Sequence, residues 1–359
     1  MSLPVLHLSG SAYEQGHRHG QTLRDDVASN LDIYFERFER EGGLPRAETL
    51  ARVQRYLPAI SRQNEQYLAG MQGIADGSGF SLLEIAALTL RYEILYYQFT
   101  ANAMSDGCTA FATLPAVTTS GHLLMGQNWD WIPQVRGALL HTTEPDGLET
   151  LSFTEAGIFG GKIGLNSAGL GLAINGLNTT DDDWSRLQKP FHVRCYEILR
   201  QRDAAGAARV VTGDDRACST NFLLAQAPDQ VIDIEAAPHT VRVLRCEDGC
   251  LVHTNHFLNP AMMGIVEPPH ERGFLSHHRL TRLRQLLLDH TPLTMLDLQV
   301  ALRDHADFPD SICPHPDPSE PSEQRYATVV SVVMDLQAGT LEISDGAPCE
   351  NPYQRVSLR

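Results

Sequence analysis

The chain has 359 residues, of which 42% are hydrophobic and 20% charged, a composition typical of a globular protein. Its formal net charge of −16 argues against a nucleic-acid-binding protein, which needs a basic face. The N-terminus lacks the basic start and apolar run of a signal peptide, and no segment approaches the roughly 20 apolar residues of a membrane span. We therefore expect a cytoplasmic protein that binds neither nucleic acid nor membrane.

The cysteines and histidines predict no metal and no cofactor. The seven cysteines are odd in number and show no disulfide framework, so we expect reduced, mostly structural thiols. Cys246 and Cys250 lack a second Cys or His pair at zinc-finger spacing. Two close histidine pairs also lack a third ligand and a nearby carboxylate base; they are His17 with His19, and His253 with His256.

The first part of the chain has helical periodicity. Apolar residues recur at helical spacing, and Ser81 followed three residues later by Glu84 has the spacing of a capping box. The pattern predicts helices over residues 11–21, 27–41, 48–74 and 81–97.

After residue 108 the pattern changes to short strands separated by turns. The pattern predicts strands over residues 109–114, 122–127, 139–143, 150–154, 161–165, 169–177, 221–226, 231–236, 240–245, 251–254, 327–335 and 340–344. Further helices are predicted over residues 192–202, 204–211, 276–289 and 294–306. Because alternating βαβ units are absent, the order favours an α+β fold with two antiparallel sheets covered by helix layers.

The segment Asp106-Gly107-Cys108-Thr109 stands where helices give way to strands. A free cysteine is usually a small buried hydrophobe, but the glycine before Cys108 leaves the preceding carbonyl sterically open. The thiol can attack that carbonyl, shift the acyl group from nitrogen to sulfur, and let water release the upstream piece. The new α-amine, with a reference pKa of roughly 7.7–8.0, can act as general base beside the thiol.

Asp130 lies between Trp129 and Trp131 at the end of a predicted strand. Strand alternation predicts that its carboxylate faces away from both indoles and shares a face with Asn128. Such a carboxylate can orient the new α-amine or receive its charge. An aspartate at a strand end is otherwise most often a turn or cap residue.

Two asparagines are candidate donors to an oxyanion. Asn255 follows an apolar strand within His253-Thr254-Asn255-His256, and loss of one oxyanion donor costs about 10²–10³ in rate. Asn175, immediately before Gly176, is the second candidate, although a turn residue explains it equally well.

Short motifs from one end of the chain to the other resemble those of one family. The chain is similar to the acyl-CoA:isopenicillin N acyltransferase family of self-processing N-terminal-nucleophile (Ntn) cysteine hydrolases. The motifs that carry this resemblance are Tyr13-Glu14-x-Gly16-x-x-x-Gly20, Arg91-Tyr92-Glu93, Asp106-Gly107-Cys108-Thr109, Gly126-Gln127-Asn128-Trp129-Asp130, Glu155-Ala156-Gly157, Gly164-x-Asn166-Ser167-Ala168-Gly169, Val252-His253-Thr254-Asn255-His256 and Ser311-Ile312-Cys313.

The resemblance implies a single Ntn-hydrolase domain over residues 1–359, built as a four-layer αββα sandwich. It implies a zymogen that cuts itself between Gly107 and Cys108. Residues 1–107 would then form a smaller chain that stays bound to residues 108–359 as a heterodimer. It further implies that Cys108 is the nucleophile, that Asp130 orients or activates it, and that Asn255 helps hold the oxyanion.

The resemblance also implies the substrate class. It points to hydrolysis or transfer of the acyl group of a small linear, non-peptide amide, with a donor such as a CoA thioester possible for transfer. Fungal members carry an Arg after Ser-Ile-Cys, whereas this chain has Pro314 and then His315, which argues against carboxylate substrates unless Arg325 or Arg279 replaces that Arg. The residues assigned to substrate binding are Trp129, Trp131, Arg91, Glu93 and His315.

Two alternatives remain open from the sequence. One is a thiol hydrolase that is never cleaved and uses His253 or His256 as its base. The other is a non-catalytic small-molecule-binding protein on the same scaffold.

Overall fold

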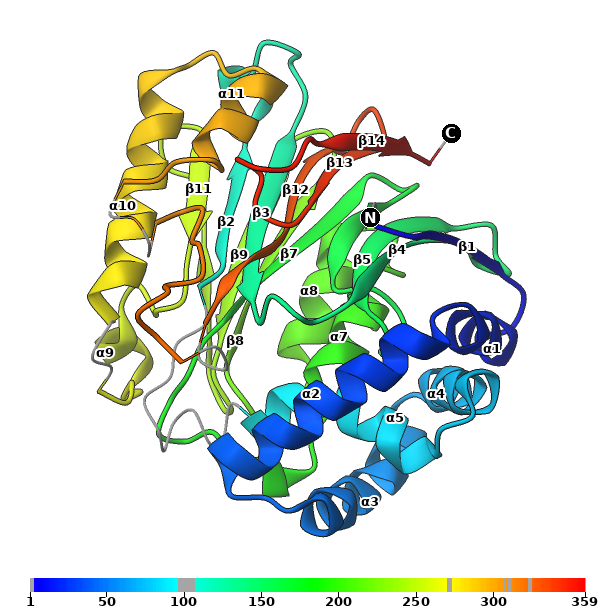
Figure 1. Cartoon of the computed structure of the whole chain (residues 1–359). Helices are drawn as coiled ribbons and strands as arrows, with labels where there is room; N and C mark the ends of the chain where they lie inside the picture. The colour runs from blue at the N-terminus through cyan, green and yellow to red at the C-terminus, as the bar shows by residue number, and fades with distance from the viewer. Residues whose placement is uncertain are drawn as a thin grey trace.

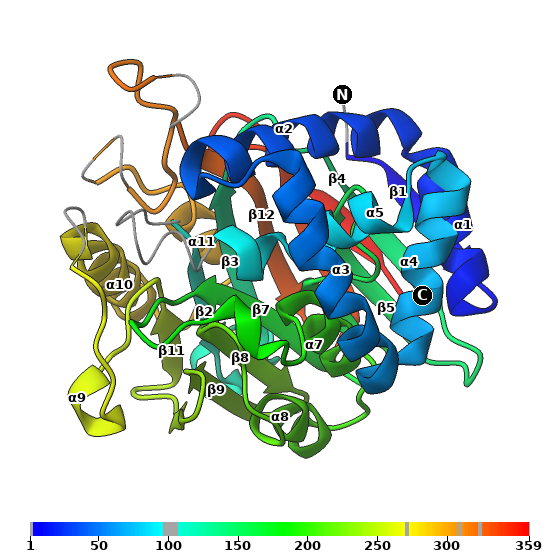
Figure 2. The ribbon, with the colours of Figure 1, turned by 90° about the horizontal axis from the view of Figure 1, so that it is seen from below.

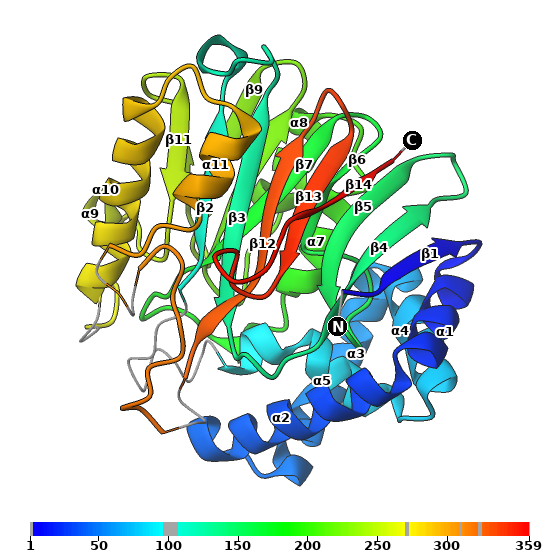
Figure 3. The same cartoon turned by 45° about the horizontal axis from the view of Figure 1, so that its top comes forward.

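Two β-sheets are stacked face to face, and helices cover the outer face of each (Figure 1). The computed structural model describes residues 3–95, 107–269, 273–306, 308, 311–321 and 325–358. Strand β7 of one sheet lies against β2 and β3 of the other, as Figure 3 shows. The fold is therefore the α+β, four-layer αββα sandwich expected from the sequence.

The larger sheet has eight strands in the order β1-β4-β5-β6-β7-β8-β9-β10. Its strands are β1 (Val5–Ser9), β4 (Gly137–Thr143), β5 (Glu149–Glu155), β6 (Ile163–Asn166), β7 (Leu170–Gly176), β8 (Thr220–Gln226), β9 (Gln230–Ala236) and β10 (Val241–Leu244). Strand β1, absent from the sequence prediction, pairs in parallel with β4, with Val5 opposite Leu139. The other described pairs of this sheet are antiparallel.

The smaller sheet has six antiparallel strands in the order β11-β2-β3-β12-β13-β14. They are β11 (Cys250–His253), β2 (Thr109–Thr113), β3 (Leu124–Trp131), β12 (Ala327–Asp335), β13 (Thr340–Asp345) and β14 (Gln354–Ser357). Thr109 lies opposite Asn128, and His253 lies opposite Ala110. The start of β2 therefore meets the ends of β3 and β11 at one end of the sandwich.

Helices at the N-terminus pack beside the larger sheet. They are α1 (Ala12–Thr22), α2 (Arg24–Gly42), α3 (Arg46–Gln63), α4 (Glu65–Ser78) and α5 (Leu82–Thr89). The glycines of the first motif let α1 and α4 pack closely: a Cβ on Gly16 would lie 2.0 Å from the carbonyl oxygen of Gly70, and one on Gly20 would lie 2.3 Å from that of Ile74. The prediction of one helix over residues 48–74 is wrong, because Asn64 ends α3 and its side chain caps α4.

The remaining helices cover the two outer faces. Helix α8 contacts β8 and β9, whereas α10 contacts β11 and α11 contacts β12. In Figure 2 the strands of the two sheets lie between α8 and α11. These helices and the short ones are α7 (Phe191–Ile198), α8 (Ala204–Thr212), α9 (Pro260–Met263), α10 (Gly273–Asp289), α11 (Met295–Ala301) and the 3₁₀ turns Pro115–Val117 and Trp184–Arg186. Among the described residues, we find no helix with the length and apolarity needed to cross a membrane.

Side-chain alternation along β2 separates two cores. Phe111 packs with α10 and α11 residues such as Leu283 and Leu298. Cys108, three residues before Phe111 and therefore on the other face, belongs to the core between the two sheets. The Cys108 side chain therefore points toward the larger sheet and not toward α10.

Candidate active site

The four predicted catalytic residues come from four separate segments that meet at one end of the sandwich. Cys108 precedes β2, Asp130 lies near the end of β3, Asn175 lies near the end of β7, and Asn255 follows β11. Asn175 donates from Nδ2 to the Cys108 carbonyl oxygen at 3.2 Å. The sheet pairing thus brings together residues that are far apart in the sequence.

Arg279 of α10 connects the nucleophile candidate to an oxyanion-donor candidate. Its Nη1 donates to the Cys108 carbonyl oxygen at 2.7 Å and to Thr109 Oγ1 at 2.9 Å. Its Nη2 donates to Asn255 Oδ1 at 3.1 Å, and Asn255 Nδ2 donates to the Gly176 carbonyl oxygen at 3.1 Å. With its oxygen held by a cation, the Asn255 amide presents its nitrogen toward β7, the side that the Cys108 side chain faces.

Asn175 is supported by a buried row of polar side chains across the larger sheet. Asn221 Nδ2 lies 3.3 Å from Asn175 Oδ1 and 2.7 Å from Asp233 Oδ1. Burial raises the pKa of Asp233 to about 6, although His253 and Asn221 oppose that rise. Because Asn175 lies inside β7, its interpretation as a turn residue is wrong.

Asp130 lies beside the bond that the sequence predicts to be cut. Its side chain is fully buried, and its Oδ1 accepts a hydrogen bond from Thr328 Oγ1 at 2.7 Å. A Cβ added to Gly107 would lie 3.1 Å from Asp130 Oδ2, so the glycine backbone packs directly against the carboxylate. A residue larger than glycine at this position would press on Asp130.

The predicted alternation along β3 is confirmed. Asn128 shares a face with Asp130, and its Nδ2 donates to the carbonyl oxygens of Leu302 and Ile312, both at 2.8 Å. On the other face, Trp129 stacks with Trp131 at a centroid distance of 6.1 Å.

A buried cluster of charges lies on the Trp129 face. Lys162 Nζ lies 3.2 Å from the centre of the Trp129 ring and 2.5 Å from Glu155 Oε1, which also accepts from Arg91 Nε at 3.0 Å. Burial lowers the pKa of Lys162 to about 7, opposed by the charge of Glu155 and, more weakly, by that of Cys108. This cluster joins two motifs of the resemblance, those that contain Arg91 and Glu155.

The residues assigned to substrate binding are placed in two regions. Arg91, Glu93, Trp129 and Trp131 are buried between the sheets and the N-terminal helices. Glu93 Oε1 accepts from the Phe191 backbone N–H at 2.6 Å, and burial raises its pKa to about 7. His315 lies in a separate group with His305, Cys313 and Cys349. The structure does not test these assignments, and they stay predictions.

The two histidines of the alternative mechanism have partners other than the Cys108 thiol. His253 Nδ1 lies 2.8 Å from the Thr254 carbonyl oxygen, and its Nε2 lies 3.2 Å from Glu235 Oε1. Burial acts to lower the pKa of His253, but Asp233 and Glu235 outweigh it and raise that pKa. His256 bonds Ser276, and burial lowers its pKa to about 3, which makes it a weak base.

Several residues at the site were not predicted in these roles. Arg279 was considered only as a substitute for a substrate-binding arginine, and Thr328, Asn221 and Lys162 were not considered. No local motif marks them. The one signal in the sequence is that Arg279 lies four and eight residues before Leu283 and Leu287, which places it on the apolar face of the predicted helix. The structure confirms that this position is buried, with Arg279 6% exposed, and a buried arginine needs partners.

A four-layer αββα sandwich with Cys108, Asp130 and Asn255 at one end is the arrangement implied by the resemblance to Ntn cysteine hydrolases. Comparison with protein families agrees: residues 117–349 match the model of the acyl-coenzyme A:6-aminopenicillanic acid acyl-transferase family. The chain belongs to this family of acyl-transfer enzymes.

Two curated relatives extend the comparison. The chain is 29% identical over 261 residues to the 40 kDa form of acyl-coenzyme A:6-aminopenicillanic-acid-acyltransferase of Emericella nidulans. The matched region covers 71% of this chain and 70% of that relative. It is 22% identical over 333 residues to an uncharacterized protein of Archaeoglobus fulgidus, covering 78% of this chain and 54% of that protein.

Solved structures with some likeness include two hydrolases. One is a Caenorhabditis elegans N-acylethanolamine-hydrolyzing acid amidase ortholog, with 14% identity, a TM-score of 0.46, and coverage of 64% of this chain and 93% of that one. Another is a mutant of the conjugated bile acid hydrolase of Clostridium perfringens, with 12% identity, a TM-score of 0.48, and coverage of 70% of this chain and 92% of that one.

Proposed function

We propose that the chain is a cysteine amidohydrolase or acyltransferase that activates itself by cleavage between Gly107 and Cys108. The observation that carries this proposal is the convergence of Asp130, Asn175, Asn255 and Arg279 on the segment that contains these two residues. Family membership supplies the acyl-transfer chemistry.

The activation step uses the thiol of Cys108 and the carbonyl carbon of Gly107. The sulfur attacks that carbon, the Gly107–Cys108 C–N bond breaks, and the proton lost by the thiol goes to the departing α-nitrogen. Water then hydrolyses the thioester, which leaves a Gly107 carboxylate and restores the thiol. The carboxylate of Asp130, which packs against Gly107, would stabilise the positive charge of the new α-ammonium group.

In the mature enzyme, the neutral α-amine of Cys108 takes the thiol proton as the sulfur attacks the acyl carbon of the substrate. That proton then goes to the leaving amine or thiol, and an acyl-enzyme remains on Cys108. Water or an acceptor amine releases the acyl group. Asn255 donates to the oxyanion, while Asn175 and Arg279 keep the Cys108 carbonyl in place.

The two pieces would stay together as one heterodimer. Residues 1–107 contribute β1, which pairs with β4 from the other piece. They also contribute Tyr34 and Arg91 to the buried cluster around Glu155. Because the cut severs none of these contacts, the sandwich remains one folding unit.

We propose a linear, non-peptide amide as the substrate and, for transfer, a donor such as a CoA thioester. The printed names of the family and of the Emericella nidulans relative support an acyl-CoA donor. Pro314 and His315, which follow Ser-Ile-Cys here, favour hydrolysis of a simple acyl-amide over transfer to a penicillin-like carboxylate.

Intact mass spectrometry of purified wild-type protein beside Cys108→Ala tests the proposal. We expect two wild-type pieces of 107 and 252 residues (359 − 107), the larger beginning at Cys108, and one unbroken variant chain. Incubation with p-nitroanilides and CoA thioesters of graded acyl length should then give a mass increase on Cys108 equal to the acyl group. A wild-type chain that stays whole across pH 5–9 yet turns over these substrates would overturn self-activation.

A further inference from the structure

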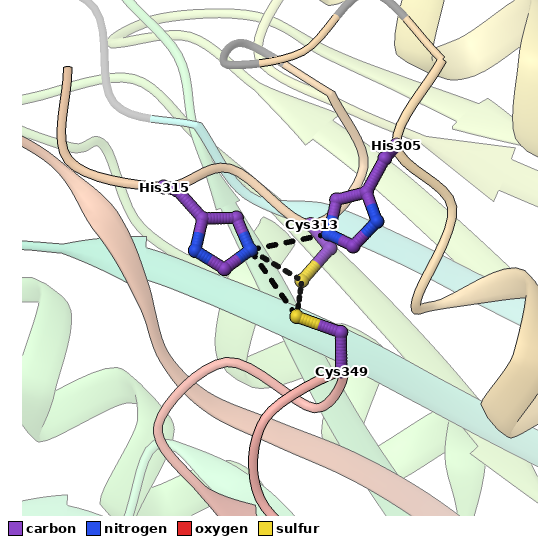
Figure 4. Close-up of side chains that lie close together, drawn as sticks. All are labelled: His305, Cys313, His315 and Cys349. Atoms are coloured by element: carbon purple, nitrogen blue, oxygen red, sulfur yellow. Dashed lines mark hydrogen bonds between the residues drawn. The ribbon is translucent and has the colours of Figure 1, made fainter.

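Two histidines and two cysteines from three segments gather around one point (Figure 4). His305 follows α11, Cys313 and His315 lie between α11 and β12, and Cys349 lies between β13 and β14. Each offers one ligand atom, and these four atoms all lie within 4.8 Å of one another. Nothing in the acyl-transfer mechanism uses this group.

Four of the six spacings between these atoms lie close to those expected for a tetrahedral zinc ion. With bonds of about 2.3 Å to sulfur and about 2.0–2.1 Å to nitrogen, a tetrahedron has edges of about 3.8 Å between sulfurs, about 3.4 Å between nitrogens and about 3.6 Å between nitrogen and sulfur. The Cys313 and Cys349 sulfurs lie 3.7 Å apart, and the Nε2 atoms of His305 and His315 lie 3.1 Å apart. His315 Nε2 lies 3.2 Å from Cys349 Sγ and 3.9 Å from Cys313 Sγ.

We propose that His305, Cys313, His315 and Cys349 bind one Zn²⁺ as a closed structural site. Two thiolates and two imidazoles around one point are a ligand set typical of structural zinc sites. Because all four ligands come from the protein, no coordination position is left for a catalytic water. The ion would therefore be a structural clamp and not a second active centre.

The outer partner of His315 supports this assignment. With Nε2 directed at the shared point, the other ring nitrogen, Nδ1, lies 3.5 Å from Glu350 Oε1. A carboxylate beside the distal nitrogen fixes the tautomer and orientation of a metal-binding histidine. Glu350 directly follows Cys349, so one short loop supplies both a ligand and this outer partner.

A disulfide is a weaker explanation of the same geometry. The two sulfurs lie 3.7 Å apart, whereas a disulfide needs about 2.05 Å. A disulfide also gives no reason for two imidazole nitrogens to converge on the sulfurs. A cation between the four atoms accounts for all of them at once.

The clamp would hold the segment that lies against the candidate active site. Between the ligands Cys313 and His315, the Pro314 carbonyl accepts from the Thr328 N–H at 3.3 Å, and Thr328 Oγ1 donates to Asp130 at 2.7 Å. Zinc would thus fix the backbone behind Asp130.

The metal content of the full-length protein tests the site directly. After equilibration with zinc and gel filtration, we expect about one zinc per wild-type chain and about a tenth of that in Cys349→Ser and His305→Gln. Cobalt(II) bound in place of zinc should show strong visible bands of a tetrahedral site and near-ultraviolet thiolate bands. Cys246→Ser and His290→Gln, which alter residues outside the group, should keep both signals.

Thermal unfolding separates the clamp from adventitious binding. A strong chelator should lower the Tm of wild type and leave that of Cys349→Ser unchanged. Wild type that takes up no zinc, ligand variants that retain it, or a peptide map with Cys313 joined to Cys349 in the freshly purified protein would each overturn the proposal. Metal content, cobalt spectra and Tm do not depend on turnover, so they test the zinc site independently of the proposed acyl-transfer activity.

Discussion

Cys108 and Asn255 are held by the same guanidinium group. Arg279 reaches the Cys108 carbonyl oxygen at 2.7 Å with Nη1 and Asn255 Oδ1 at 3.1 Å with Nη2. An ammonium group is a point donor and cannot span two acceptors in this fixed geometry. Arg279 thus sets the position of the backbone of Cys108, the proposed nucleophile, relative to Asn255, the proposed oxyanion donor.

Arg279→Lys is therefore expected to lower kcat/KM by about 10²-fold, mainly through kcat, because a displacement of about 1 Å in the reacting groups costs that much. Stopped assays on fully matured protein would measure it. Arg284→Lys on the same helix, whose exposed side chain pairs with Glu247 and Asp248, is the matched control and should leave kcat unchanged. An effect confined to KM would show that Arg279 binds substrate and does not position Cys108.

Asp130→Asn should slow self-cleavage by about 10–10³-fold, because an opposite charge close to the departing α-nitrogen favours its protonated form by roughly 1–3 pKa units. The amide keeps an oxygen that can accept from Thr328, so the variant should fold, but it loses the negative charge beside Gly107. The time course of the intact mass after synthesis measures the rate. Asp229→Asn, at an exposed turn, should mature like wild type; normal maturation of Asp130→Asn would remove Asp130 from this role.

Most of the fold could be predicted because its strands and helices carry local signals. Turn motifs and alternation located the β2–β3 and β6–β7 hairpins to within a few residues. Strand β1 has a two-residue alternation of exposed and buried side chains, but it is short and pairs with residues near 140, far along the chain. Local sequence carries no sign of such a distant partner.

The candidate site could be predicted only in part, for the same reason. Cys108 and Asp130 stand in recognisable motifs, whereas Arg279 lies 171 residues beyond Cys108 and has none. The proposed zinc ligands gave no signal because Cys349 lies 36 residues from Cys313, outside any finger spacing. Only the tertiary fold, which combines sheet pairing with the packing of α10 on β11, brings these segments together.

His256→Gln should retain self-cleavage and kcat/KM within about tenfold of wild type, a smaller loss than the about 10²–10⁴-fold expected for a general base. Burial already lowers the pKa of His256 to about 3, and the ring bonds Ser276. Activity and intact mass of this variant, and of His253→Gln with its fold checked by circular dichroism, measure the outcome. Loss of turnover in a folded, fully matured histidine variant would favour a histidine base over the α-amine.

Glu93→Gln is expected to change how stability depends on pH. Burial raises the pKa of Glu93 to about 7, from an ordinary value of 4.5. The folded state therefore binds more protons than the unfolded state between these values, and stability falls as pH rises from about 4.5 to about 7. The full penalty, about 3 kcal/mol for a difference of that size, is present above pH 7.

The glutamine side chain still accepts from the Phe191 N–H but does not titrate. We expect the free energy of unfolding of Glu93→Gln to exceed that of wild type at pH 8 and to equal it near pH 4.5. Urea unfolding of both proteins at each pH measures this difference. Burial also raises the pKa of Asp182 to about 7. Asp182 titrates in both proteins, so its contribution to the pH dependence cancels when their stabilities are subtracted. Glu36→Gln, at an exposed position of α2, is the control and should show no pH-dependent difference. A constant difference at every pH would mean that Glu93 stays ionised in the folded protein, and that Arg91 and Arg194 outweigh its burial.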